Sequence, residues 1–179
     1  MRTENGRTSV VPYDAQRRDG VAAGRSDAPL ESSAPFPVPP GEASYELTTT
    51  TRLSPELSAT SSETTATWWF RSKETAGPTP LPVSVVRFDA RPALDGTLPA
   101  GRTANFPVTV QGPAATAPAT LRVQVSYDEG RTWRPLHVRH GRVEVRTPAK
   151  GGTVSLRGTV TDRSGNKSEV TVLRAYLAG

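Results

Sequence analysis

The 179-residue chain is long enough for one domain of ordinary size with an additional tail, and too short for a complete α/β peptidase or a β-propeller. It contains 15 glycines, 17 prolines and no cysteine, and 35% of its residues are hydrophobic, which excludes a disulfide scaffold, cysteine-ligated zinc and a cysteine nucleophile. Residues 1–80 hold 8 basic and 10 acidic residues, whereas residues 81–179 hold 14 basic and 7 acidic ones, so a polyanionic partner is expected to contact the second half.

Residues 1–43 are predicted to form a disordered arm. Five prolines between positions 29 and 40 interrupt every periodic pattern, and the few apolar residues of this region cannot form a core. Arg17 and Arg18 resemble the start of a twin-arginine signal, but the apolar stretch of about 7–15 residues that such a signal needs does not follow. No other segment reaches the ~18 apolar residues of a membrane helix, so we expect neither an export signal nor a membrane span in this chain.

Two strands are predicted at 45–53 and 64–72, where β-branched and aromatic residues are frequent. An isolated pair of strands is only marginally stable in water. The pair at 44–72 therefore either docks on the residues that follow it or is the remnant of a preceding β-domain. Residues 73–81 are predicted to be a linker, because prolines here and at position 82 favour an extended backbone without ladder hydrogen bonds.

From residue 82 to 179 the pattern is that of short β-strands. In Leu121–Ser126 every position alternates between an apolar and a polar side chain, which is typical of a strand with one buried face. Seven strand-like segments, separated by glycine-containing turns, predict an all-β chain with no helix, in which residues 82–179 form an immunoglobulin-like or fibronectin-III-like antiparallel sandwich. These segments are 83–89, 103–110, 121–126, 132–139, 142–146, 154–161 and 168–177.

The segment Ser126–Trp133 has the sequence SYDEGRTW, which matches the Asp-box pattern S-x-D-x-G-x-T-W of sialidases and other β-proteins. In such a turn Ser126 and Asp128 accept hydrogen bonds from backbone amides, while Gly130 supplies a positive φ. We expect Trp133 to re-enter the core and hold the second strand in register. Sialidases carry one copy of the motif per blade, so the single copy here favours a structural hairpin over a ligand contact.

A second turn is predicted around Asp162, Gly165 and Asn166. The Asp162 side chain can bond the turn backbone, and Gly165 and Asn166 tolerate left-handed geometry. Asp162 alone offers too few carboxylate oxygens for calcium. We therefore predict a strand–turn–strand connection and no metal site.

His137 and His140 are the only histidines. A spacing of three places them on opposite faces of a strand, and no acidic residue lies within two positions to orient either one. They are predicted to be solvent-facing or turn residues and not metal ligands. A serine triad needs a nucleophile on a sharp glycine-rich turn, whereas Ser126 and Ser155 lie in predicted strands, so we expect neither catalysis nor a cofactor.

Two groups of side chains could form binding surfaces. Strand alternation places Trp68 and Phe70 on one face and Trp69 on the other, which favours core or interdomain packing over an exposed sugar platform. The other group consists of outward arginines that could contact a polyanion. The alternative is a solvated sheet face in a chain whose 22 basic residues include only three lysines. These candidate contact residues are Arg122, Arg142, Arg146 and Arg157.

Residues 44–179 resemble the extreme C-terminal region of large secreted subtilisin-like serine peptidases of high-GC bacteria. In that family the catalytic Asp, His and Ser belong to a peptidase domain far upstream, which this chain lacks. The resemblance therefore implies an extracellular, non-catalytic β-sandwich appendage and transfers no catalytic residue. The segments that carry it are Tyr45–Leu47, Thr67–Ser72, Leu81–Asp89, Ser126–Arg134, Val154–Asp162, Gly165–Asn166 and Val172–Tyr176.

The expected function is that of an accessory or structural module that positions or stabilises a secreted peptidase domain. The alternative is a module that binds cell-surface polysaccharide or another polyanion, such as an anionic cell-wall polymer. A free-standing enzyme such as a sialidase is a third hypothesis. Nucleic acid is not an expected partner.

Overall fold

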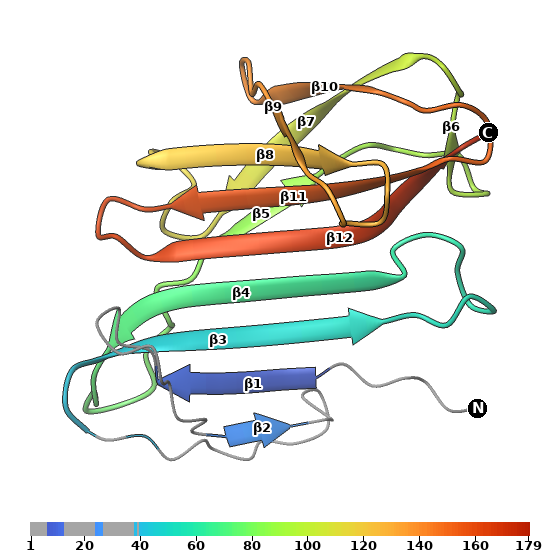
Figure 1. The fold of residues 1–179 in the computed structure, drawn as a ribbon. Coiled ribbons are helices and arrows are strands. Elements are labelled where there is room, and N and C mark those ends of the chain that lie inside the picture. The colour runs from blue at the N-terminus through green and yellow to red at the C-terminus, as the bar shows by residue number, and fades with distance from the viewer. Residues whose placement is uncertain (1–6, 13–23, 27–37, 39) are drawn as a thin grey trace.

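The computed structural model describes residues 7–12, 24–26, 38 and 40–179. The predicted fold class is confirmed, because all regular structure in these residues is β and the sheets are almost entirely antiparallel (Figure 1). Within the described residues no helix is long and apolar enough to cross a membrane.

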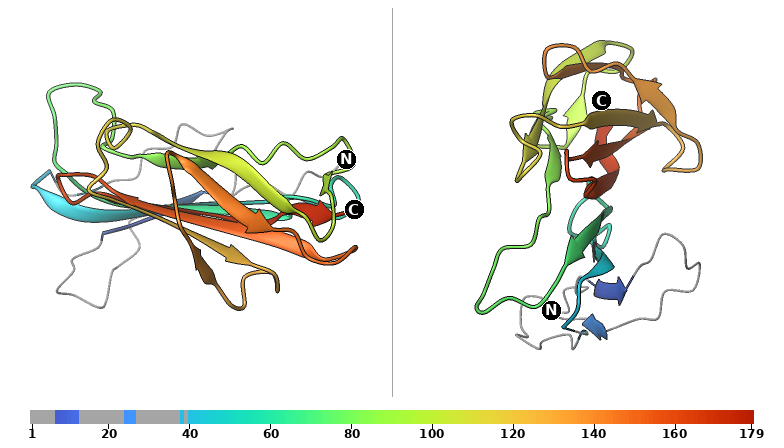
Figure 2. Two further views of the ribbon diagram at one scale, coloured as in Figure 1. Left: turned by 90° about the horizontal axis from the view of Figure 1, so that it is seen from above. Right: turned by 90° about the vertical axis from the view of Figure 1, so that its left-hand side faces the viewer.

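Residues 85–178 form a sandwich of two sheets. Strands β5 (Val85–Phe88), β7 (Thr103–Gln111) and β10 (Arg142–Arg146) make a three-stranded sheet in the order β10-β7-β5. It packs on the part of a larger sheet that has the order β12-β11-β8-β9 (Figure 2). The larger sheet is made here of β8 (Thr120–Ser126), β9 (Arg134–Leu136), β11 (Thr153–Thr161) and β12 (Lys167–Ala178).

The core between the two sheets is built from the inward residues of the alternating strands. Phe106 of β7 meets Tyr176 of β12 edge to face, with ring centroids 6.4 Å apart. Gly158 of β11 allows β5 to approach closely, because a Cβ atom there would lie 2.5 Å from Cγ1 of Val86. The other buried apolar residues of this core are Val108, Ala114, Val123, Val125, Val143, Val145, Val154, Leu156 and Val160.

Strands β3 (Ala43–Arg52) and β4 (Glu63–Ser72) extend the larger sheet beyond β12. Glu63–Trp69 of β4 pairs antiparallel with Lys167–Leu173 of β12, so the hairpin 43–72 continues the sandwich sheet. The Trp68 indole nitrogen donates a 2.8 Å hydrogen bond to the Ser84 carbonyl, which attaches the hairpin to the chain that enters β5. Of the two arrangements that the sequence allows for this pair, the structure has the docked one.

The region before residue 43 contains two strands that the sequence does not predict. Backbone pairing connects β1 (Arg7–Pro12) to β3, and β2 (Gly24–Ser26) to β1. Pairing needs only a free sheet edge and an extended segment, and β3 supplies such an edge, so hydrophobic content is a poor guide here. In the rest of the predicted disordered arm, residues 38 and 40–42 belong to no strand, and residues 1–6, 13–23, 27–37 and 39 lie outside the described residues.

Two further differences concern short elements. The predicted strand 132–139 is reduced to the three residues of β9, an edge strand of the larger sheet, where Pro135 is tolerated although it has no N–H for a ladder. A two-residue strand, β6 (Thr97–Leu98), pairs parallel with the end of β12, and the sequence predicts no strand there.

Candidate functional site

The Ser126–Trp133 turn closes the connection between β8 and β9 through its own side chains. The Ser126 hydroxyl accepts a hydrogen bond from the Gly130 amide at 2.8 Å and donates one to Asp128 at 2.7 Å. Asp128 also accepts bonds from the amide and the hydroxyl of Thr132. Gly130 has a φ of 87°, as the turn requires. These polar groups therefore hold the turn together.

The hydrogen bonds that Asp128 accepts stabilise its charged form. The Thr132 hydroxyl makes the largest contribution, followed by the Thr132 amide and the Ser126 hydroxyl, and together they lower the pKa of Asp128 to about 2. A general acid or base near neutral pH needs the opposite shift. Asp128 is thus suited to a structural role.

Trp133 does not enter the core as the sequence predicts. It is half-buried and lies on the outer face of the large sheet, where the guanidinium carbon of Arg157 is 4.1 Å from the centre of its ring. A Cβ atom at Gly130 would lie 3.1 Å from Leu173 and 3.3 Å from the Trp133 ring, so the ring packs beside these two residues. The prediction is wrong because the turn brings the chain back over the sheet face that carries Arg157, opposite to the core.

The turn between β11 and β12 is organised by Asp162. One of its carboxylate oxygens accepts bonds from the amides of Ser164 and Asn166, and the other accepts a bond from the Asn166 side chain. Gly165 has a φ of 85°. The Asn166 side-chain oxygen in turn accepts a bond from the Arg71 amide at the end of β4. The turn therefore joins the sandwich to the hairpin 43–72.

The four candidate polyanion contacts do not lie on one surface. Arg122 and Arg157 project from β8 and β11 on the outer face of the large sheet, while Arg142 and Arg146 project from β10 on the outer face of the three-stranded sheet. Since the core separates these two faces, one ligand strand cannot lie flat across all four residues. Arg157 is also engaged with Trp133, Thr171 and Glu169.

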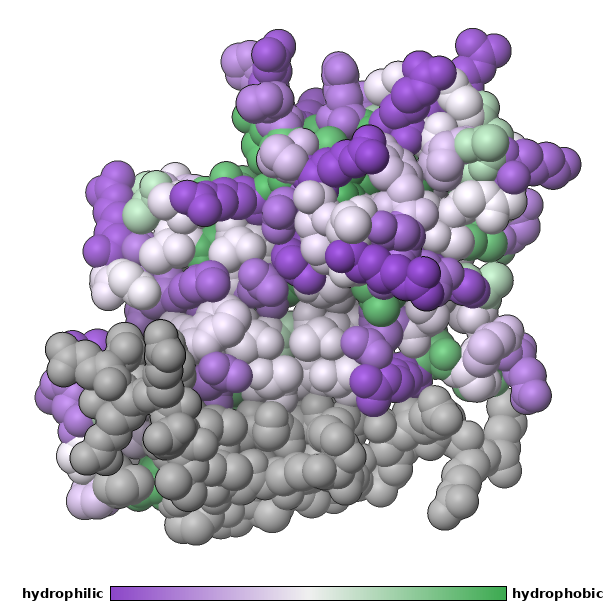
Figure 3. Space-filling view, viewed as in Figure 1, coloured by the Kyte–Doolittle hydropathy of each residue, from purple (hydrophilic) through white to green (hydrophobic). Residues whose placement is uncertain are grey.

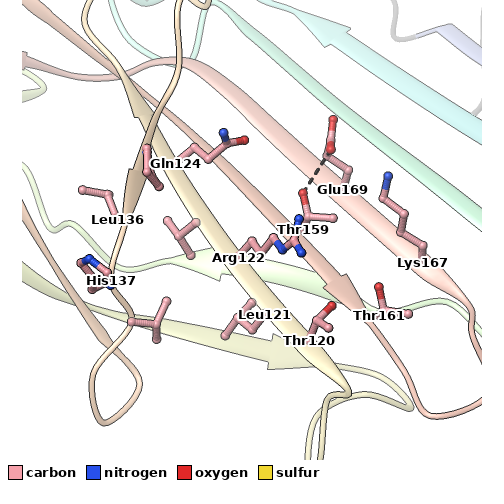
Figure 4. A pocket seen from close by; sticks show the side chains of 13 residues that line it. Thr120, Leu121, Arg122, Gln124, Leu136, His137, Thr159, Thr161, Lys167 and Glu169 are labelled. Atoms are coloured by element: carbon pink, nitrogen blue, oxygen red, sulfur yellow. Dashed lines mark hydrogen bonds between the residues drawn. The ribbon is translucent and has the colours of Figure 1, made fainter.

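The outer face of the large sheet carries a shallow hollow of about 880 Å³ (Figure 4). Glu169 accepts a hydrogen bond from Thr159 in this hollow, and Arg122 and Gln124 line it from β8. In Figure 3, which views the molecule from the same side as Figure 1, this face is mostly pale and purple and has no broad apolar patch. The other lining residues are Thr120, Leu121, Val123, Pro135, Leu136, His137, Val138, Thr161 and Lys167.

The aromatic triplet is divided between the two faces of β4. Phe70 is buried and stacks on Tyr45, with ring centroids 5.9 Å apart, while Trp68 donates its hydrogen bond to Ser84 from the same face. Trp69 lies on the outer face, where the Lys167 ammonium is 4.3 Å from its ring centre. Its indole nitrogen donates a hydrogen bond to Glu46. One face of the half-buried Trp69 ring is thus occupied by Lys167, which makes the ring a poor platform for a sugar.

His137 and His140 are exposed and line one cleft of about 520 Å³ beside the connection between β9 and β10. Arg139 and Asn105 also line it, and the sequence interpretation includes neither of them. The clustering of basic residues in 131–146 is the sequence signal that could have indicated Arg139; nothing in the sequence indicates Asn105, which comes from β7. The remaining lining residues are Pro135, Leu136, Arg142 and Glu144.

Among the described residues, no group of three or more His, Asp or Glu side chains is placed to hold a metal ion. Comparison of the chain with protein-family models, curated proteins and solved structures finds no match.

Proposed function

We propose that this chain is a non-catalytic accessory module that holds a neighbouring domain in a fixed orientation. The observation that carries the proposal is the pairing of β4 with β12, which joins the hairpin 43–72 to the sandwich as one sheet. A continuous sheet transmits orientation better than a linker, because rotating the hairpin breaks its ladder of hydrogen bonds. The exposed segment 73–80 alone would not fix the orientation.

The polar side chains in the described part of the chain support a structural role. Ser84, Ser126, Ser155 and Ser168 are buried, and each accepts a hydrogen bond from a backbone amide. A serine whose oxygen is buried and bonded to an amide is a poor nucleophile, because a substrate cannot reach it. Ser126 does lie next to a carboxylate, but the pKa of Asp128 is lowered to about 2, so Asp128 is a weak base. These hydroxyl groups stabilise turns and strand crossings instead.

By the resemblance to subtilisin-like serine peptidases, the neighbour would be a peptidase domain upstream of these residues in a secreted bacterial protein. The Ser126–Trp133 turn, an Asp-box by sequence, would then serve the fold and not a sialidase reaction. Polyanion binding, the alternative, needs a different set of arginines from the four that the sequence indicates.

The purified chain tests the non-catalytic part of the proposal. We expect no hydrolysis of casein or of a fluorogenic sialoside above that of a buffer blank. Any turnover should be compared with that of the double variant H137A/H140A, which removes both imidazoles. Turnover that survives repurification and is lost in this variant would show that the chain carries its own catalytic site.

A further inference from the structure

The tip of the connection between β9 and β10 is a tight two-residue turn. Arg139 and Arg142 exchange two backbone hydrogen bonds, each of 2.9 Å. The residues between them, His140 and Gly141, have φ values of 50° and 70°. Positive φ at both central residues is the geometry of a type I′ turn, which sets the flanking residues directly opposite each other.

This turn places two arginine side chains on the same face of the hairpin. Residues directly opposite each other across such a pair project to the same face, with Cβ atoms about 4.5–5.5 Å apart. Two like charges at this spacing destabilise a hairpin, so the repulsion between Arg139 and Arg142 destabilises the turn between β9 and β10. An anion bound between the two arginines would attract both guanidinium groups and offset their mutual repulsion.

Asn105 holds one of the two arginines in place. Its side-chain oxygen accepts a hydrogen bond from Nε of Arg142, and its carbonyl accepts one from Nη2 of the same residue at 2.9 Å. The Asn105 side-chain nitrogen donates to Glu144. Glu144, the one acidic residue of segment 131–146, is thus bonded to the Asn105 side-chain amide, and no arginine of the described residues forms an ion pair with it.

The rest of segment 131–146 is also basic. It contains five arginines and both histidines, and all five arginines are exposed. No described carboxylate lies within 4.0 Å of any of these five, whereas arginines elsewhere in the described chain do have such partners. The paired arginines are Arg52, Arg71, Arg91, Arg157 and Arg174.

From these observations we propose that Arg139 and Arg142, with the cleft of about 520 Å³ beside them, bind the phosphate groups of a linear anionic polymer. Guanidinium groups bind phosphate oxygens in a bidentate manner, and Asn105 leaves the terminal nitrogens of Arg142 with further N–H donors. His137 and His140 add donors from the same cleft. The site is independent of the proposed accessory role.

The cleft favours a polymer without bases over nucleic acid. Proteins that bind single-stranded nucleic acid stack the bases on exposed aromatic rings. No Phe, Tyr or Trp lines this cleft, and Trp133, the nearest tryptophan in sequence, lies under Arg157. Inorganic polyphosphate and phosphodiester-linked wall polymers share the required chemistry.

The test uses the full chain and long-chain inorganic polyphosphate in a fluorescence titration at several salt concentrations. The variant R139Q/R142Q should bind at least tenfold more weakly, and the slope of log K against log salt should decrease by about 1.4, since each phosphate contact on a flexible strand contributes about 0.7. The control R87Q/R163Q loses the same charge at exposed positions outside the segment and should retain binding within about threefold. Equal losses in both variants, or no binding by the wild type, would overturn the proposal.

Two more measurements distinguish binding at this site from a general attraction between a basic protein and an anion. The variant N105A keeps every charge but frees Arg142, and binding should weaken several-fold; unchanged binding would contradict the positioning of Arg142. An oligothymidylate that binds as tightly as polyphosphate would overturn the choice of a base-free polymer. Bacterial cell walls, compared before and after removal of their phosphodiester polymers, distinguish a wall-bound source from free polyphosphate.

Discussion

The guanidinium carbon of Arg157 lies 4.1 Å from the centre of the Trp133 ring, on the face of the large sheet that points away from the core. The contact covers a tryptophan that closes the turn after β8, and it uses an arginine that the sequence suggests for a ligand. One residue pair therefore explains why Trp133 is absent from the core and why Arg157 is a poor candidate for polyanion binding.

Substitution W133A should lower the free energy of unfolding by about 2–3 kcal/mol. This is less than the loss of about 3–5 kcal/mol for a fully buried tryptophan, because the ring is only half-buried. Denaturant melts of W133A, R157Q and the double variant would give the coupling between the two residues, which should be about 0.5–1 kcal/mol. R122Q, on the same sheet face, should change the stability by no more than about 0.5 kcal/mol. Additive losses in W133A and R157Q would contradict the stacked contact.

The substitution D128N should make the protein less stable at neutral pH and less sensitive to acid. The folded pKa of Asp128, about 2, lies below the value of about 3.9 expected in the unfolded chain. The ionised group therefore stabilises the fold above pH ~4, and this contribution is lost as the pH falls toward 2. Melting temperatures of wild type and D128N should differ most above pH ~4 and converge near pH 2. A gap that stays constant over this range would mean that the turn does not depend on the charge.

The close approach of β5 to β11 can be tested at Gly158. A methyl group there would meet Cγ1 of Val86 at 2.5 Å and Cζ of Phe88 at 3.0 Å. We expect G158A to lose about 1–3 kcal/mol of stability, as other overpacked cores do. Gly77 provides the matched control, since no atom lies within 4 Å of a Cβ at that position and G77A should be close to neutral. A stable G158A would mean that the sheets separate easily.

The Tyr176 hydroxyl is buried near the Thr147 hydroxyl, and neither group forms a hydrogen bond of normal geometry with the described residues. Removal of the Tyr176 hydroxyl in Y176F should therefore leave the stability unchanged or raise it by up to about 1 kcal/mol. Burial raises the pKa of Tyr176 to about 12, above the value of about 10 in an unfolded chain. The wild type should therefore lose stability as the pH rises from 10 toward 12, and Y176F should lose less. Thermal melts in this range would show it, and parallel curves for the two proteins would contradict it.

Most strands from residue 43 onward were predictable from the sequence, since alternation in segments such as Leu121–Ser126 indicates a buried face directly. Strands β1, β2 and β6 were not, because they depend on pairing with a sheet edge or a strand end that lies far away in the chain. The sequence does not indicate on which face of the sheet a turn residue lies. Trp133 follows a turn whose path over the sheet depends on Gly130 and Leu173, and Leu173 is forty residues away in the chain. The surface on which each candidate arginine lies was also not predictable. Alternation indicates that a side chain points outward, but it does not indicate which of the two sheets carries that side chain. Asn105 beside Arg142 is a contact between strands that only the sheet register creates.

The proposed role requires the hairpin 43–72 and the sandwich to form one continuous sheet. Hydrogen exchange of the native protein can be measured at the amides of Thr64–Trp69 in β4 and of Val154–Val160 in β11. If β4 is fixed on β12, the ladder amides of β4 should be protected to within about tenfold of those of β11, a difference of about 1.4 kcal/mol in opening free energy. Amides throughout β4 that exchange at the rate of an unstructured chain, while β11 remains protected, would contradict it.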